Sequence, residues 1–217
     1  MKVNRKKIII LIAGLMVLTL IVVIGSYWIN SILYVSTEDA RITGDMVKIS
    51  PQGSGKIVDL FIEEGSYVEK NEIVGRLEII NLNDPNIELS LIRSPISGIV
   101  IKKQGTVGEI ISAGQILAYA IDPDALYVSA NIEETKLKKI KTGQKVVIKL
   151  DEYKGKKFFG KVRSVGEAAN SIFSLLSLSS ESTFTKVVQK IPVNIDLDYK
   201  GVKLSAGTNA FVKIHIK

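Results

Sequence analysis

Few side chains in this sequence could carry out acid–base chemistry, and they are scattered along the chain. The single histidine, His215, lies near the C-terminus in an alternating segment between Lys213 and Lys217. Residues two apart on a strand point to the same face, so two lysines would flank the imidazole and disfavour a general-base role. The glutamate pairs Glu63-Glu64 and Glu133-Glu134 lie at a turn and at the start of a predicted helix, where solvated acids are expected. We therefore predict no catalytic residue, which disfavours an exported hydrolase.

Metal and nucleic-acid chemistry are also disfavoured. The 217 residues include no cysteine, so neither a disulfide nor a thiolate metal site can form, and no other metal-ligand spacing is present. Four of the 29 basic residues, Lys2, Arg5, Lys6 and Lys7, precede the first apolar run, and the remaining 25 nearly balance the 22 acidic residues. A nucleic-acid-binding face needs a concentrated basic patch. We expect no metal, no cofactor and no nucleic-acid partner.

The elements that would position any site are set by an internal repeat. Segments 50–74 and 94–117 share glycines and apolar residues, and from Gly55 and Gly98 onward their offset is constant at 43 residues. The matched pairs are Gly65 with Gly108, Val68 with Ile111, Glu72 with Gln115 and Val74 with Leu117. One supersecondary unit used twice, with short strands and glycine turns, predicts a small β-sandwich. We expect Gly55 and Gly98 to permit its turns.

The junction between the two halves, Ile79–Ser90, is short. Its twelve residues include Pro85 and several Asn and Asp residues. At about 1.5 Å per residue, one six-residue helical arm would reach only about 9 Å. The junction therefore cannot form two long helices.

An uncharged run near the N-terminus predicts a membrane anchor. Ile8–Ile29 would form a helix roughly 33 Å long at about 1.5 Å per residue, enough to cross a bilayer. Lys6 and Lys7 before the run predict a cytoplasmic N-terminus, and Tyr27 and Trp28 would lie at the far interface. The alternative, a cleaved signal peptide, should have a shorter apolar region that ends in small residues. We predict a single-pass protein of the cytoplasmic membrane with most of the chain outside the cytoplasm.

Beyond the anchor, short alternating segments predict β-structure. The predicted strands are 47–49, 56–62, 146–150, 159–165, 193–197 and 210–216. Asn131–Ile140 instead predicts a short helix, because Asn131 could cap it and its acids precede its lysines. Ser171–Thr183, rich in serine and leucine, predicts a loop across a surface or an interface that becomes ordered on assembly. Such a succession of short strands is typical of a barrel or a sandwich.

Four stretches follow one another in a specific order: 37–55, 92–100, 126–144 and 184–193. They contain Thr37-Glu38-Asp39-Ala40, Arg93-Ser94-Pro95-Ile96-Ser97-Gly98, Asn131-Ile132-Glu133-Glu134-Thr135 and Phe184-Thr185-Lys186-Val187-Val188-Gln189. Together they resemble the membrane fusion protein family, also called HlyD-type or periplasmic adaptor subunits, and most closely its EmrA-like branch. The resemblance covers most of residues 37–217.

The resemblance implies a mainly β fold with a lipoyl-like sandwich and a β-barrel, in addition to the N-terminal transmembrane helix and one short helix. The implied organisation is a cytoplasmic N-terminus at 1–7, a transmembrane helix at 8–29 and a connector with the first barrel strand at 30–45. The lipoyl-like (barrel-sandwich hybrid) domain then covers 46–121, with its short junction at 79–90, and the β-barrel domain covers 122–217.

The family implies a function in assembly without an active site. Its members bridge an inner-membrane transporter to an exit path by packing side by side, so we expect self-association and an inner-membrane partner. The EmrA-like branch favours a major-facilitator transporter for drug efflux or secretion, and an ABC transporter stays possible. Most relatives insert a long helical hairpin at the junction, which this chain lacks, so we expect a compact adaptor without direct contact to an outer-membrane channel. An engineered deletion of the hairpin is the alternative origin of the short junction.

The candidate assembly interface follows from the same resemblance. It consists of two sandwich loops and one barrel segment: Gln52, Gly53, Ser54, Ser94, Pro95, Ser97, Gly98, Phe184, Thr185, Lys186 and Gln189. The candidate membrane-interface residues are Lys6, Lys7, Tyr27 and Trp28. Ordinary strand and turn residues are the alternative for the loops. Lys136, Lys138, Lys139 and Lys141 form either a solvated face or a contact with lipid headgroups or the transporter.

Two further functions stay as alternatives. A lipoyl-like domain could carry biotin or lipoate, but such carriers display a lysine on the turn between the halves, and none occurs from Glu72 to Arg93. A structural cell-envelope protein without a transporter partner would share every coarse feature, and only the family resemblance disfavours it.

Overall fold

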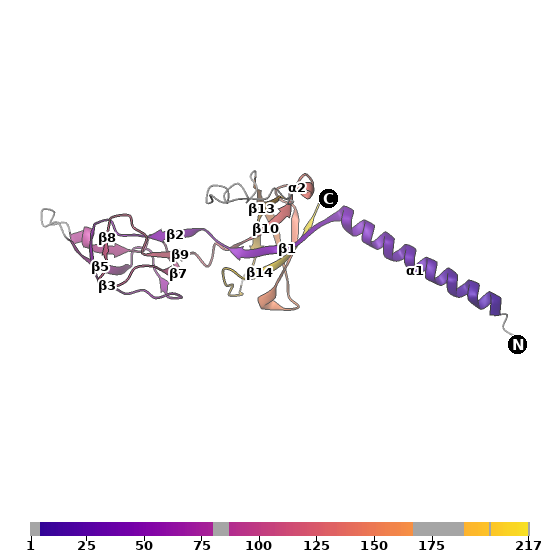
Figure 1. The fold of residues 1–217 in the computed structure, drawn as a ribbon, viewed down its shortest axis with the longest axis horizontal. Coiled ribbons are helices and arrows are strands. Elements are labelled where there is room, and N and C mark those ends of the chain that lie inside the picture. Colours follow the sequence, from indigo (N-terminus) through magenta and orange to yellow (C-terminus); the bar gives the residue numbers. More distant parts are fainter. Residues whose placement is uncertain (1–4, 80–86, 167–188, 200, 217) are drawn as a thin grey trace, which may run out of the picture. The chain divides into compact units, whose positions relative to one another are not determined.

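The computed structural model describes residues 5–79, 87–166, 189–199 and 201–216, which form two compact units (Figure 1). One unit comprises Met1–Arg41, Val128–Asp198 and Asn209–Lys217, and it contains a helix and a barrel. The other comprises Ile42–Tyr127 and Tyr199–Thr208, and it contains the sandwich. The fold is mainly β, as the sequence predicts.

The chain begins with α1, Arg5–Leu33, a helix of 29 residues. Its described side chains include Leu15, Val22 and Ile24, which are 58–62% exposed. Two hydroxyl groups on the helix donate to carbonyls three residues earlier: Thr19 to Met16 and Ser26 to Val23, each at 2.8 Å. Counted over the residues that the structure describes, no helix is both long and apolar enough to span a membrane.

The sandwich consists of two four-stranded sheets. Its strands are β2 (Met46–Ile49), β3 (Gly55–Leu60), β4 (Tyr67–Val68), β5 (Ile73–Ile79), β6 (Leu91–Arg93), β7 (Gly98–Lys103), β8 (Ile110–Ile111) and β9 (Ala118–Ile121). One sheet has the order β2-β9-β7-β4 and the other the order β6-β5-β3-β8. Alternating apolar side chains from both sheets, such as Ile49, Ile57, Ile92 and Val100, form one buried core.

The predicted repeat is confirmed and organises the whole sandwich. An offset of 43 residues converts each strand order into the other, because β2, β3, β4 and β5 correspond to β6, β7, β8 and β9. The register agrees as well: β3 pairs Ile57 with Leu77, and β7 pairs Val100 with Ala120. Both pairings shift by one residue immediately afterwards, so even the β-bulge is repeated.

The predicted role of Gly55 and Gly98 is wrong, because neither has a positive φ. They are the first residues of β3 and β7, and a Cβ on either would clash with a backbone carbonyl, that of Glu78 or of Ile121. These glycines therefore allow two strands to approach closely. The turns rely on other residues. Gly65 and its repeat counterpart Gly108 have φ values of 88° and 92°. Asn71 and its repeat counterpart Gly114 have φ values of 68° and 80°.

The junction between the halves is as short as predicted. β5 ends at Ile79, and the 3₁₀-helix η1 (Ile87–Ser90) leads directly into β6. Only residues 80–86 lie between the two elements, which leaves no length for a long helical hairpin.

The unit that includes α1 also contains a closed six-stranded barrel. Its strands are β1 (Tyr34–Thr43), β10 (Tyr127–Glu133), β11 (Lys145–Leu150), β12 (Lys157–Val165), β13 (Lys190–Asp198) and β14 (Asn209–His215), in the order β1-β10-β13-β12-β11-β14. Strand alternation directs residues such as Val128, Ile148, Ile195 and Val212 inward, and each of these is 0% exposed. The 3₁₀-helix η2 (Asp151–Tyr153) lies in the turn between β11 and β12.

The predicted helix Asn131–Ile140 is too long at both ends. Asn131, Ile132 and Glu133 belong to β10, because Val128, Ala130 and Ile132 alternate into the barrel core. The helix α2 spans only Glu134–Leu137, and its cap is Glu133, whose side chain makes no capping hydrogen bond. Strand periodicity therefore overrides the local capping pattern. The predicted loop Ser171–Thr183 lies outside the described residues.

Candidate functional site

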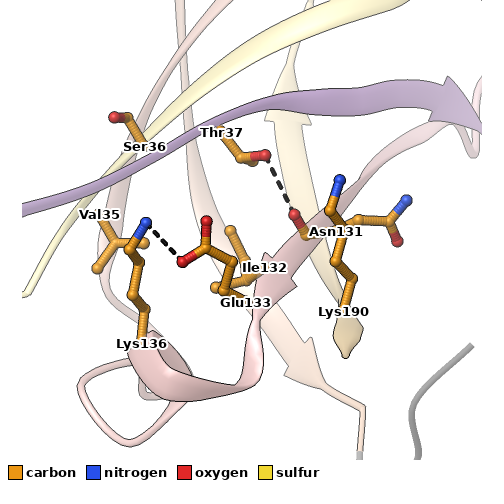
Figure 2. A pocket seen from close by; sticks show the side chains of 8 residues that line it. All are labelled: Val35, Ser36, Thr37, Asn131, Ile132, Glu133, Lys136 and Lys190. Carbon is orange, nitrogen blue, oxygen red and sulfur yellow. Dashed lines mark hydrogen bonds and ion pairs between the residues drawn. The ribbon is translucent and has the colours of Figure 1, made fainter. Parts of the chain in front are cut away.

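The barrel carries a polar pocket of about 70 Å³ beside β1, β10 and β13 (Figure 2). Its lining residues are Val35, Ser36, Thr37, Asn131, Ile132, Glu133, Lys136 and Lys190. The hydroxyl of Thr37 donates to the carbonyl oxygen of Asn131 at 3.1 Å, which links β1 to β10. On one side of the pocket, Lys136 forms an ion pair with Glu133 at 2.9 Å.

Asp39 is the centre of a second polar cluster on the same strands. Its carboxylate accepts hydrogen bonds from the Lys190 ammonium at 2.8 Å and from the Asn131 side-chain amide at 3.0 Å. These two donors, with Lys190 the stronger, hold the pKa of Asp39 below its usual range. The Thr37 hydroxyl also accepts from the Asp39 backbone N–H at 3.1 Å. The cluster thus joins β1, β10 and β13 through one carboxylate.

The chemistry of this pocket favours recognition over catalysis. Drug-sized ligands occupy pockets of about 300–1,000 Å³, so this pocket is too small to enclose one. Within the described ranges, no group of three or more potential metal-ligating side chains is present. Asp39 pairs with Lys190, and Glu133 pairs with Lys136. The contact with Lys136 lowers the pKa of the Glu133 carboxyl. These ion pairs can position strands and present a polar surface.

Neither His215 nor the paired glutamates form an acid–base site. The His215 ring packs edge-on against Tyr34 with ring centroids 5.0 Å apart, and the Lys213 ammonium lies 4.0 Å from the Tyr34 centroid. In the second glutamate pair, Glu133 ends β10 and forms an ion pair with Lys136, whereas Glu134 is the first residue of α2.

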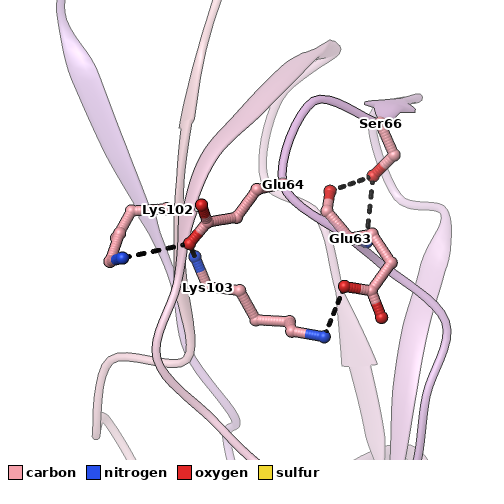
Figure 3. A network of polar contacts seen from close by, with 5 residues as sticks. All are labelled: Glu63, Glu64, Ser66, Lys102 and Lys103. Atoms are coloured by element: carbon pink, nitrogen blue, oxygen red, sulfur yellow. Dashed lines mark hydrogen bonds and ion pairs between the residues drawn. The ribbon is translucent and has the colours of Figure 1, made fainter.

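The first glutamate pair belongs to an ion-pair network on the sandwich (Figure 3). Glu63 pairs with Lys103 at 2.6 Å, and Glu64 pairs with Lys102 at 3.2 Å. The Glu64 carboxylate also accepts the backbone N–H of Lys103 at 3.0 Å. This backbone hydrogen bond, followed by the contact with Lys102, lowers the pKa of Glu64. The network connects the β3–β4 turn to the end of β7.

The positions that correspond to this network through the 43-residue offset are only partly charged: Lys102 corresponds to Asp59, which pairs with Arg76, and Glu63 corresponds to Thr106. Lys103 corresponds to Leu60, and Glu64 corresponds to Val107, which is 56% exposed. Ile110 and Phe61 are nearby in the chain and are 68% and 60% exposed. The two halves of the sandwich therefore present different surfaces on equivalent backbones.

The two predicted interface loops occupy equivalent places in the repeat. The Ser54 hydroxyl accepts the backbone N–H of Ala113 at 3.0 Å, and the Ser97 hydroxyl accepts that of Lys70 at 3.0 Å. The equivalent glycines at the ends of these loops make equivalent contacts, because Gly55 packs against Glu78 of β5 and Gly98 packs against Ile121 of β9.

Only some of the predicted interface residues offer a side chain to solvent. Gln52, Ser54, Pro95 and Ser97 are exposed, whereas Gly53, Ser94 and Gly98 are buried. The Ser94 side chain is turned inward and donates to the carbonyl of Ile96 at 2.6 Å.

The structure describes only some of the remaining predicted site residues. Phe184, Thr185 and Lys186 lie outside the described residues, whereas Gln189 is exposed and its carbonyl accepts the backbone N–H of Glu134 at 3.0 Å. Of the predicted membrane-interface residues, Lys6, Lys7, Tyr27 and Trp28 all belong to α1, and the Trp28 side chain is 69% exposed.

Sequence reasoning missed the Asp39–Asn131–Lys190 cluster. The three residues are separated by up to 151 positions, so no local spacing connects them. A signal was nevertheless present, because Asp39 and Asn131 lie in the first and third of the family-like stretches, and Lys190 lies in the fourth. Residues from stretches that resemble one family can meet on adjacent strands even when they are far apart in the sequence.

The sandwich of two repeated halves and the six-stranded barrel both match domain families of membrane fusion proteins. Residues 45–123 match the barrel-sandwich hybrid domain of RND membrane fusion proteins, and residues 125–215 match the AAEA-like β-barrel domain.

Two named relatives show which members of this class the chain is similar to. The chain is 35% identical to YhbJ of Bacillus subtilis, named as a candidate efflux system component, over 98% of this chain and 95% of that protein. It is also 35% identical to the multidrug export protein EmrA of Haemophilus influenzae, over 60% of this chain and 35% of that protein. The chain thus spans nearly all of YhbJ but only about a third of EmrA.

Solved structures support the fold. The structure of the periplasmic adaptor protein EmrA matches with a TM-score of 0.57 and 16% identity, over 86% of this chain and 99% of that one. The chain belongs to the EmrA-like membrane fusion proteins and lacks their long helical hairpin.

Proposed function

We propose that the chain is the membrane-anchored adaptor subunit of a multidrug efflux or secretion system and acts by assembly. The observation that carries this proposal is the match to YhbJ along almost the whole of both chains. EmrA of Haemophilus influenzae, which is named for multidrug export, adds support over part of the chain. The ion-paired surfaces and the small barrel pocket suit binding and not catalysis.

The anchor of this adaptor is the uncharged segment Ile8–Ile29 within α1. A Ser or Thr hydroxyl on a lipid-facing helix can be satisfied by a carbonyl of the preceding turn, and Thr19 and Ser26 both donate to such carbonyls of α1. With Lys6 and Lys7 in the cytoplasm and Tyr27 and Trp28 at the far interface, the sandwich and barrel lie outside the cytoplasm.

The partner in this proposal is an inner-membrane transporter, with a major-facilitator transporter favoured over an ABC transporter. This preference follows from the resemblance to the EmrA-like branch, and the efflux function is supported by EmrA, EmrK and MdtN, each of which is named for multidrug export or resistance. Copies of the chain would associate side by side around the transporter. The exposed residues Gln52, Ser54, Pro95 and Ser97 of the sandwich loops, and the segment Phe184–Gln189, are the proposed contacts.

The short junction limits how far this adaptor extends from the membrane. Residues 80–86 between β5 and η1 cannot form a hairpin that reaches a distant outer-membrane channel. We therefore expect export through a short complex close to the membrane surface.

A pull-down tests the proposal. The tagged full-length chain would be extracted from its native membrane in several mild detergents, and the co-purifying proteins identified by mass spectrometry. We expect a transporter at near-stoichiometric level, and its class would identify the energy source. Recovery of the chain alone in every detergent would contradict the adaptor function and favour a structural envelope protein.

A further inference from the structure

The barrel carries a group of exposed cations on and after α2. Lys136, Lys138, Lys139 and Lys141 are all exposed, and the stretch from Glu133 to Lys141 has four lysines against two glutamates. Lys136 pairs with Glu133, but within the described part of the chain the ammonium groups of the other three lysines have no hydrogen bond or ion pair. These three residues, the lysine turn, therefore keep their full charge available for a partner.

The backbone of the lysine turn is held in place by the side chain of Gln144. Gln144 accepts the backbone N–H of Lys141 at 3.0 Å and donates to the carbonyl of Lys139 at 3.1 Å. Ile140, between these lysines, is only 6% exposed and fixes the turn to the barrel. The cations are thus presented by an ordered segment.

This end of the barrel is also where α1 enters. Val35, two residues after the end of α1, lines the same pocket as Lys136 of α2 (Figure 2). The backbone N–H of Ile216 donates to the carbonyl of Leu33, the last residue of α1, at 3.0 Å. If α1 is the anchor, the lysine turn lies next to the membrane surface.

We infer that the lysine turn docks the barrel onto anionic phospholipid headgroups, an inference that rests on the proposed anchor. A lysine close to an anionic leaflet is attracted to it by charge alone, with no need for a shaped site. Charged residues are depleted in the core of a protein–protein interface, and lysine is depleted at interfaces relative to the rest of the surface. Among the described barrel residues, only Phe159 of β12 is a large apolar side chain with high exposure, and a single side chain does not form an apolar patch. A lipid surface therefore fits the lysine turn better than a protein partner.

A fluorescence experiment on the full-length chain tests this inference. Since the chain has no cysteine, Thr142→Cys, at the exposed position directly after the lysine turn, accepts a single fluorophore. The labelled protein is reconstituted into nanodiscs of phosphatidylcholine, with or without phosphatidylglycerol, that contain a headgroup quencher. We expect quenching at least about fivefold stronger with phosphatidylglycerol, the factor that one lysine near an anionic surface supplies, and reversal of this gain at high salt.

Matched variants isolate the lysines. K138E/K139E/K141E should abolish the gain from phosphatidylglycerol, whereas K154E/K156E/K157E makes the same charge change at the β11–β12 turn, at the other end of β11 from α2, and should preserve it.

Three outcomes would overturn the inference. Equal quenching in both kinds of nanodisc would exclude a headgroup contact. Quenching that changes only when the transporter is added would assign the turn to a protein partner. A chain that is not retained in either kind of nanodisc would refute the anchor. The pull-down of a transporter is a separate experiment, so its result distinguishes failure of the anchor from failure of the adaptor function.

Discussion

The two halves of the sandwich have the same backbone but different surfaces. The turn after β3 and the turn after β7 share their hydrogen bonds, since Gly65 N–H donates to Val100 at 2.7 Å and Gly108 N–H donates to Ile57 at 2.8 Å. On these equivalent turns, Glu64 takes part in an ion-pair network, whereas its counterpart Val107 is exposed and apolar. The repeated glycines and buried residues determine the fold, and the side chains that differ determine which partners each half can contact.

The largest expected effect comes from the two close-approach glycines. Gly55→Ala and Gly98→Ala each place a Cβ against a carbonyl of the neighbouring strand, so each should lower the free energy of unfolding by about 1–3 kcal/mol. Urea denaturation of both variants measures this, with Lys56→Ala, at an exposed position beside Gly55, as the control. If one variant were as stable as wild type, the two halves would not be equivalent in their packing.

The left-handed turn residues should show a smaller and more selective effect. Gly114→Ala should lower the free energy of unfolding by about 1–2 kcal/mol, because its φ of 80° disfavours a Cβ. Gly114→Asn should cost much less, since its counterpart Asn71 adopts a φ of 68°. The comparison is made by thermal unfolding. If Gly114→Ala and Gly114→Asn lowered the free energy of unfolding equally, the positive φ would not be the reason for the loss.

The paired serines connect stability with assembly. Ser54→Ala and Ser97→Ala each remove one acceptor for a backbone N–H, so each should cost about 0.5–1.5 kcal/mol. Urea denaturation should give similar losses for both. If the loops are also subunit contacts, each variant should weaken co-purification of the transporter by more than Lys56→Ala does. Unchanged co-purification would leave the serines with a purely structural role.

The smallest expected effect concerns the ion-pair network that breaks the repeat. Because the pKa of Glu64 is lower in the folded protein, its stabilising contribution is present above the unfolded-state pKa and is lost as pH falls through the folded-state value. Lys102→Gln removes one cause of this shift, so its urea midpoint should vary less with pH in the acidic range than that of wild type. An unchanged pH dependence would show that the network does not stabilise this turn.

The sequence predicted the elements that repeat or alternate. The 43-residue offset, visible in its glycines, correctly predicted a sandwich built from two equivalent halves, and strand periodicity located β11, β13 and β14. It could not distinguish a glycine needed for positive φ from one needed for close approach, which is why Gly55 and Gly98 were misassigned. Nor could it predict the contact of Asp39 with Lys190, because only barrel closure brings these two residues together.

The most direct test of the adaptor function is drug accumulation in cells that lack the chain, the co-purifying transporter, or both. If the chain works only through that transporter, each single deletion should raise accumulation equally, and the double deletion should add nothing. Restoring the full-length chain should restore export only when the transporter is present. Additive effects, or no effect of deleting the chain, would contradict the account.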